Sequence, residues 1–207
     1  MIILRYCVLD DIPAPGALTT NSMVDLGVVM GAFGPNKDQV FQWQIDFTVK
    51  LFDGYTISRT AVLPGAITYG KYSNVKIRIG EAVTREDAKQ QFSGLKNPGD
   101  GNRIEAALTQ ARDVLFSSDY GARDVAPKIL LVFLDSFIEG ERMDCLQNIV
   151  RELRRRGVKI VLVGIGEEFD ELQSKLLVAD AGVSFTSTNF EELNARAVQI
   201  ASATTTG

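Results

Sequence analysis

The stretch VDLGVVMGAFGPNKDQVF, residues 24–41, joins an apolar strand to the start of a helix. Residues 24–30 are apolar with little alternation, as expected for a central strand covered on both faces. Asn36, with Gln39 three residues later, predicts a helix N-terminus. The turn between them, GAFGP at 31–35, carries no carboxylate, hydroxyl or cationic side chain. Because α/β domains bind ligands at such turns, an empty one needs an explanation.

Strands and helices alternate along the rest of the chain. Strands are predicted at about 60–69 and 73–79, joined as a hairpin, and at 128–135, 158–166 and 183–187. Helices are predicted to follow Asn36 and to span about 102–116, 143–153 and 167–180. The first of them has an apolar face made of Val40, Trp43, Phe47 and Leu51. Two more helices are predicted to begin at Thr84, with Asp87 three residues later, and at Thr188, where Glu191 completes a capping box. This order predicts an α/β fold with a doubly wound, mostly parallel sheet, one antiparallel edge strand and helices on both faces.

The length of 207 residues predicts one domain. We expect an irregular lead-in at residues 1–23, the domain at 24–202 and a short tail at 203–207. The opening apolar segment is too short to span a bilayer and lacks the features of a signal peptide. If the protein acts outside the cell, its signal has been removed or the chain is an excised domain.

Composition excludes several classes of chemistry. The chain has no histidine, so Ser-His-Asp, Cys-His and His-ligated zinc sites are ruled out. Cys7 and Cys145 form no CxxC pair; they allow one disulfide, or two separate core thiols equally well. The net charge of −4 argues against a nucleic-acid partner. The basic run at 151–156 is interpreted as a solvated helix end, with a polyanion site as the alternative.

The order of these blocks resembles that of a von Willebrand factor type A (VWA) domain. The matching blocks, over residues 24–202, are VDLGVVM, VFQWQIDFTVKLF, AVLPGAITYGKYSNVKIRI, GNRIEAALTQARDVLF, APKILLVFLDS, RRRGVKIVLVGIG and VSFTSTNFEELNARAVQI. The blocks resemble those of the extracellular-matrix branch, as in matrilins, collagen VI and the matrix proteins of mussel byssal threads. The resemblance implies a ligand site at the carboxyl ends of the central strands.

In this family that site is a metal-ion-dependent adhesion site (MIDAS). A D-x-S-x-S turn, a distant Thr and an Asp hold Mg²⁺ through oxygen atoms and leave one position for a partner's carboxylate. Aligned without a gap, the turn's Asp falls on Gly31 and its two serines on Phe33 and Pro35; the distant Thr falls on Asn102 and the last Asp on Asp135. The resemblance therefore implies a degenerate site with no metal ligand set and no cofactor.

The retained positions also have local interpretations. Asn102, with Glu105 three residues later, is predicted to cap a helix, and Asp135 is equally suited to accept loop N–H bonds. As surface residues of the lost metal site, Phe33, Asn102 and Asp135 are the candidates for partner binding.

Three functions are compatible with this pattern. The favoured one is a noncatalytic, secreted extracellular-matrix or adhesion module that binds a protein, with collagen-like chains as candidates, without Mg²⁺ and without membrane insertion; tandem or self-association is compatible with it. The second is a metal-dependent adhesion domain with a site rebuilt from Asp135, Asn102 and Asp100. The third is an intracellular enzyme or nucleotide-binding domain, for which GIGEEF at 164–169 is a weak match because Phe169 replaces the third glycine.

Overall fold

The computed structural model describes residues 22–136, 140–165, 177–178, 183–187 and 190–203. Within these residues a single six-stranded sheet has the order β3-β2-β1-β4-β5-β6. Its strands are β1 (Val24–Met30), β2 (Val62–Tyr69), β3 (Ser73–Ile77), β4 (Lys128–Leu134), β5 (Val158–Ile165) and β6 (Val183–Ser187). All neighbouring strands are parallel except the β2–β3 hairpin, so the predicted sheet with one antiparallel edge is confirmed.

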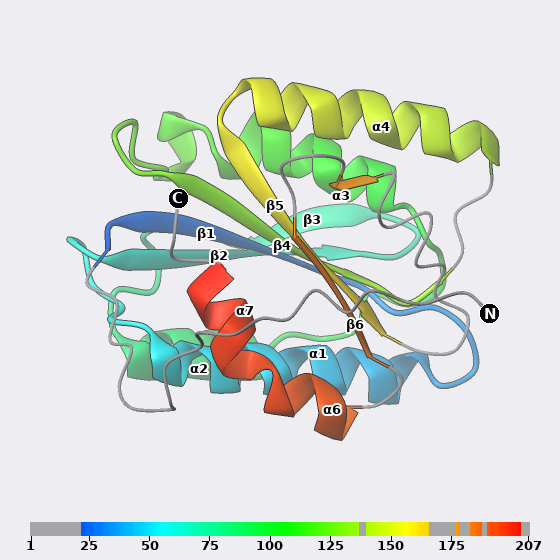
Figure 1. The fold of residues 1–207 in the computed structure, drawn as a ribbon, viewed down its shortest axis with the longest axis horizontal. Helices are drawn as coiled ribbons and strands as arrows, with labels where there is room; N and C mark the ends of the chain where they lie inside the picture. The colour runs from blue at the N-terminus through cyan, green and yellow to red at the C-terminus, as the bar shows by residue number, and fades with distance from the viewer. Residues whose placement is uncertain (1–21, 137–139, 166–176, 179–182, 188–189, 204–207) are drawn as a thin grey trace, which may run out of the picture.

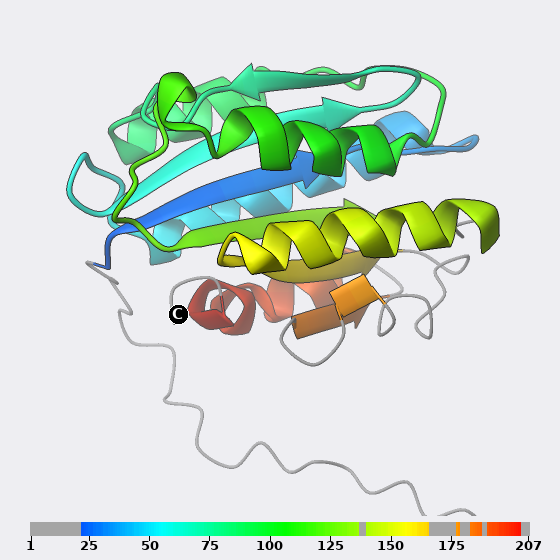
Figure 2. The same cartoon turned by 90° about the horizontal axis from the view of Figure 1, so that it is seen from above.

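Helices cover both faces of this sheet, as predicted (Figure 1). One face carries α1 (Lys37–Leu51), α2 (Arg85–Ser93), α6 (Phe190–Ala195) and α7 (Ala197–Ala203). The other carries α3 (Ile104–Gln110), which continues as a π-helical turn at Ala111–Leu115, and α4 (Gly140–Arg155). Seen from above, α3 and α4 lie side by side along the sheet (Figure 2).

Each face of the sheet has its own apolar core, because side chains of a strand alternate between the faces. In β1, Leu26, Val28 and Met30 pack with α1 and the C-terminal helices, whereas Val29 packs with α3 and α4. All seven residues of β1 are buried. The unbroken apolar run at 24–30 is thereby explained by a strand at the centre of the sheet.

Several local predictions need correction. Asn36 precedes α1 but its side chain makes no cap bond, whereas Thr84 does cap α2 by accepting the N–H of Asp87 at 3.1 Å. Trp43 is only partly buried, because the core face of α1 is turned toward Phe41, Gln44, Ile45, Phe47, Thr48 and Leu51. Cys145 is exposed on α4, so it is not a core thiol.

Other predictions fall outside the described residues, and the prediction of a single C-terminal helix is wrong. Cys7, nearly all of the predicted helix at 167–180 and the cap residue Thr188 lie outside the described residues. The single C-terminal helix that we predicted is two helices, with Arg196 between them. In the part of the chain that the structure describes, no helix is both long and apolar enough to cross a bilayer.

A buried ion pair fastens the amino-terminal end of β1 to the segment before β4. Asp25 is fully buried, and its carboxylate accepts the backbone N–H of Arg123 at 2.6 Å and the guanidinium Nε at 2.7 Å. The same guanidinium donates to the carbonyl oxygens of Val24 and Ala61 at 2.8 and 2.9 Å. Arg123 thus satisfies a buried charge and links three chain segments.

We predict that Arg123→Ala lowers the free energy of unfolding by about 3–5 kcal/mol, because it leaves the Asp25 carboxylate buried without its partner. Urea unfolding of the two proteins measures this difference. Arg103→Ala is the control, since its side chain is 63% exposed and 3.8 Å from Glu105, and it should change the free energy by less than about 1 kcal/mol. Equal effects of the two substitutions would contradict the prediction.

Candidate functional site

The candidate site lies where the carboxyl ends of β1 and β4 meet. β1 pairs with β2 on one side and with β4 on the other, so the chain order reverses between β1 and β4. In doubly wound sheets this reversal opens a crevice for ligands at the carboxyl edge. The turn at 31–35 follows β1, and Asp135 and Ser136 follow β4, so the topology brings these predicted site positions together.

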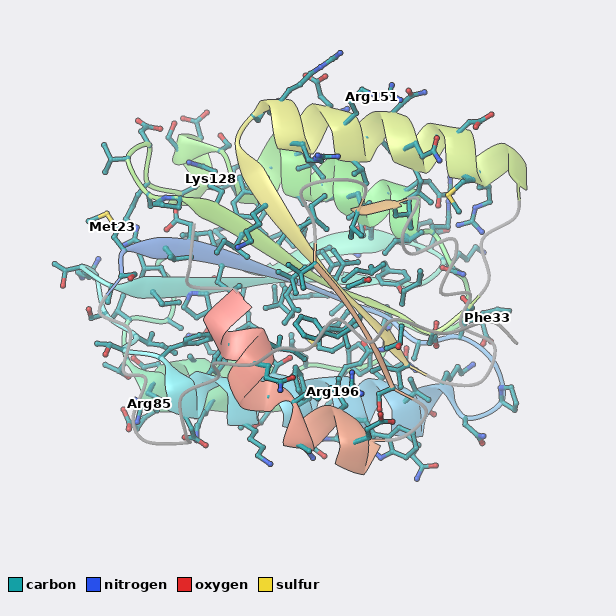
Figure 3. All side chains as sticks on the ribbon, in the orientation of Figure 1. Met23, Phe33, Arg85, Lys128, Arg151 and Arg196 are labelled. Carbon is teal, nitrogen blue, oxygen red and sulfur yellow. The ribbon has the colours of Figure 1, made fainter. Side chains whose placement is uncertain are left out.

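A hydrogen bond from the turn to β4 holds the two strand ends together. The backbone N–H of Phe33 donates to Oδ2 of Asp135 at 2.8 Å. This is the loop N–H bond that one interpretation of Asp135 predicted. The Phe33 ring itself is 51% exposed, and Figure 3 shows it at the edge of the molecule, beyond the end of β1. The aromatic ring of Phe33 is therefore exposed, while its backbone is held in place by the hydrogen bond to Asp135.

Gln44 of α1 fixes the first residue of the same turn. Its fully buried side-chain amide accepts the N–H of Gly31 at 3.1 Å and donates to the Gly31 carbonyl oxygen at 2.8 Å. Sequence reasoning missed this residue, although one signal was present. Gln44 stands between Phe41 and Thr48 on the buried face of the helix, and a buried amide needs polar partners.

Tyr69, the last residue of β2, lies directly against Gly31. A β-carbon at position 31 would come within 2.4 Å of the Tyr69 carbonyl oxygen and 2.7 Å of its ring. The Tyr69 phenol is buried and donates to the carbonyl oxygen of Phe133 at 3.0 Å. The glycine thus permits β2 to approach β1 more closely than any side chain would allow.

Asn102 does not cap α3 as predicted. The helix begins at Ile104 after Arg103, which makes no side-chain cap bond, and Asn102 instead donates its Nδ2 to Oγ of Ser136 at 2.6 Å. Asn102 therefore bonds Ser136 across the site and does not cap the helix that follows it. Arg142 of α4 supports it by donating to the Asn102 carbonyl oxygen and, at 2.6 Å, to Oε2 of Glu105.

Asp100, the third oxygen donor of the rebuilt-site hypothesis, forms an ion pair with Lys37 at the start of α1. Its side chain is 79% exposed. Nearby, Asn97 donates to the Asp38 carboxylate at 2.8 Å, so the loop before α3 is tied to α1. These contacts hold Asp100 on the surface beside a cation, where its charge is already balanced.

The side chains at this edge do not match the oxygen set that a MIDAS needs. Mg²⁺ prefers near-octahedral oxygen coordination with at least one or two carboxylates. Gly31, Phe33 and Pro35 supply no side-chain oxygen, and Oδ2 of Asp135 already accepts the Phe33 N–H. Among the described residues there is no cluster of three or more acidic or cysteine side chains that could hold a metal ion. Oδ1 of Asn102 is buried and accepts no hydrogen bond from the described residues.

A doubly wound sheet whose strand order reverses between β1 and β4 defines a broad class of α/β domains. Within this class the chain belongs to the VWA family, because the model of the von Willebrand factor type A domain matches residues 34–199. The predicted resemblance is therefore confirmed. The predicted limits of the domain, 24–202, stay a prediction.

The relatives are extracellular-matrix proteins. The human collagen alpha-5(VI) chain is 25% identical over 168 residues, which cover 80% of this chain and 6% of the relative. Mouse matrilin-1 is 25% identical over 152 residues, which cover 73% of this chain and 30% of the relative. The chain thus spans a minor part of each, and the predicted extracellular location agrees with both.

The fold is shared with proximal thread matrix protein 1 from the mussel byssus, solved with a zinc-occupied MIDAS motif. The TM-score is 0.76 at 19% identity, and the match covers 88% of this chain and 48% of that one. At this identity the likeness concerns the fold.

We predict that Gly31→Ala destabilises the fold by about 2–3 kcal/mol, because the new methyl group would meet the Tyr69 carbonyl oxygen and force the backbone to shift. The free energy of unfolding in urea measures the loss. Gly54→Ala is the matched control, since its methyl group would lie 3.4 Å from the Ala201 side chain, an ordinary contact; it should cost less than about 1 kcal/mol. A harmless Gly31→Ala would show that β1 and β2 separate easily.

Ionisation of Tyr69 gives a second prediction. Burial raises the pKa of its phenol well above the ordinary value of 10.0; Asp135 adds to the shift and Arg142 opposes it. Because the folded-state pKa is the higher one, the contribution of Tyr69 to stability is complete below pH 10 and is lost as the pH rises toward the folded-state pKa.

The wild-type free energy of unfolding should therefore fall more steeply than that of Tyr69→Phe, by about 1.4 kcal/mol for each pH unit above about 10. At neutral pH the variant should be less stable by about 1 kcal/mol, because the hydrogen bond to Phe133 is lost. Urea unfolding at neutral and alkaline pH measures both differences, and the other titrating groups cancel in the comparison. Parallel curves for the two proteins would show that the phenol is not protected by burial.

Proposed function

We propose that this chain is a noncatalytic protein-binding module of the extracellular matrix, and that its partner binds the carboxyl edge of the sheet without Mg²⁺. The proposal rests on one observation above all. The edge that carries the metal in the family here has Gly31 packed against Tyr69 and an exposed Phe33 where the first turn serine would stand.

The exposed side chains at this edge suit a protein partner. Phe33 is 51% exposed and Tyr72, in the turn between β2 and β3, is 68% exposed. The ammonium group of Lys71 lies 5.7 Å from the Tyr72 ring centroid. Aromatic side chains on firmly held backbone are the usual anchors of protein interfaces, since they bury a large area at a small cost in conformational entropy.

Phe33 is the proposed anchor residue of the interface, and Asn102 and Asp135 make hydrogen bonds beside it. Asp135 holds the Phe33 backbone, and Asn102 joins Ser136 next to it. Collagen-like chains are the first partners to test, because collagen VI chains are among the relatives. Self-association, or arrangement in tandem with further modules, is compatible with the same surface.

The two other hypotheses have less support. A rebuilt metal site needs Asp135, Asn102 and Asp100 together, but Asp100 is paired with Lys37 on the surface. An observation in its favour is the buried Oδ1 of Asn102, which accepts no hydrogen bond from the described residues. An enzyme or nucleotide-binding protein would need polar side chains in the turn after β1, where this chain has Phe33 and Pro35. Most of the 164–169 loop lies outside the described residues.

Binding to immobilised triple-helical collagen, measured by biolayer interferometry, tests the proposal. We expect the same dissociation constant in MgCl₂ and in EDTA, and at least about tenfold weaker binding for Phe33→Ala, as is typical for an interface anchor. Val125→Ala is the control, because Val125 is 83% exposed and precedes β4 at the opposite edge of the sheet.

Three outcomes would count against the proposal. Loss of binding in EDTA would favour the rebuilt metal site, and Asp135→Ala should then abolish Mn²⁺ binding in a calorimetric titration. Unchanged binding by Phe33→Ala would move the interface away from the carboxyl edge. Absence of binding in both buffers would reject collagen as the partner.

A further inference from the structure

A groove lined by cationic side chains lies at the end of α4, far from the carboxyl edge. It is open and has a volume of about 560 Å³. Its lining residues are Arg151, Arg154, Arg155, Gly157, Val158 and Lys159. Because α4 runs antiparallel to the strands, its C-terminus and the first residues of β5 meet at the amino-terminal edge of the sheet (Figure 1). Figure 3 shows Arg151 on α4, pointing outward and well away from Phe33.

The groove concentrates positive charge on a chain that is acidic as a whole. Four of its six lining residues are cationic and none is acidic, whereas the net charge of the chain is −4. Arg155 lies 3.6 Å from the carboxylate of Glu152 on the same helix. Arg156, the next cation along the chain, donates to the Arg112 carbonyl oxygen at 2.8 Å and lies 3.6 Å from Asp113 and 3.9 Å from Glu152.

The helix macrodipole does not account for this cluster. One or two cations in the last turn suffice to complement the carbonyl end of a helix, and each further cation repels those already there. Gly157 closes α4 in a left-handed conformation, with φ of 78°. Lys159 lies beyond this turn, in β5, where the helix dipole cannot explain it. The lining therefore combines cations from two elements around one hollow.

We propose that this groove binds a sulfated polysaccharide of the glycosaminoglycan type. Sulfate groups stay ionised at all physiological pH values, and planar guanidinium groups pair with such oxyanions through two parallel hydrogen bonds. Three arginines and a lysine around one hollow match a chain that carries anionic groups on successive sugars. The arginine stems offer apolar surface to the sugar rings.

The content of the groove favours a polysaccharide over a nucleic acid. Single-stranded nucleic acids are usually held by stacking of bases on aromatic side chains, and the lining contains none. The open groove has a volume of about 560 Å³, which leaves room for a short segment of a flexible chain. The extracellular setting of the relatives agrees with this choice.

Binding of the full chain to a heparin oligosaccharide, measured by calorimetry at physiological ionic strength, tests this proposal. The triple variant Arg154→Ala, Arg155→Ala and Lys159→Ala should bind at least about tenfold more weakly, because three charged contacts are removed. The control variant Lys50→Ala, Lys76→Ala and Lys96→Ala removes the same charge from exposed positions on separate elements, and it should bind almost as the wild type does.

Two probes separate the ligand classes. De-sulfated heparin should bind more weakly than heparin, and a single-stranded DNA oligonucleotide of equal charge should bind more weakly still. Amide chemical-shift changes in the wild-type chain on addition of heparin should be confined to residues near 151–159, which tests the site without any substitution.

The proposal is overturned if heparin does not bind, if both triple variants lose affinity equally, or if the shift changes lie elsewhere. DNA binding as tight as heparin binding would replace the polysaccharide with a nucleic acid. The heparin result and the collagen result are independent, because Phe33→Ala leaves the groove intact.

Discussion

The close contact between Gly31 and Tyr69 sets the distance between the carboxyl ends of β1 and β2, and much of the candidate site depends on it. The space that a β-carbon would need lies within 2.4 Å of a backbone oxygen, which cannot rotate away as a side chain could. The turn after β1 is then held by groups that bond its backbone: Gln44 bonds both polar atoms of Gly31, and Asp135 accepts the N–H of Phe33. These bonds come from α1 and from the residue that follows β4, and they leave the Phe33 side chain facing outward.

The direction of the strands separates two surfaces of different chemistry. Parallel strands place all their carboxyl ends at one edge, where the exposed rings of Phe33 and Tyr72 lie in turns that follow β1 and β2. The opposite edge carries charge: the buried Asp25–Arg123 pair fastens the sheet there, and the cationic groove lies at the start of β5. An aromatic edge suits burial against a protein, and a cationic groove suits a solvated polyanion. The two proposed binding surfaces therefore lie at opposite edges of the sheet, and ligands of the two would not compete.

The fold could be predicted because its signals are repeated along the chain. Apolar runs in the sequence, such as 24–30 and 128–134, indicate buried strands. The order of strands and helices is then compatible with only a few sheet topologies. The positions of Gly31, Phe33 and Asp135 followed from the same pattern. Asn102 was misinterpreted because a helix cap is a local signal, whereas its partner Ser136 is 34 residues away. Tyr69 and Gln44 were missed for a similar reason, since nothing near them in sequence indicates a bond to Phe133 or Gly31.

A metal ion at this edge would have to compete with the bonds that already hold it. Coordination by Oδ2 of Asp135 would compete with the hydrogen bond that it accepts from the Phe33 N–H. Rotation of Asn102 to aim Oδ1 at the ion would strain its bond to Ser136. Recruitment of Asp100 would break its ion pair and bring the Lys37 ammonium group close to a divalent cation. The ion would also have to give up part of a hydration shell that Mg²⁺ releases reluctantly. Two of the three candidate ligands are thus already engaged, Asp135 with the turn and Asp100 with Lys37, which is the physical reason to expect binding through the turn's own surface.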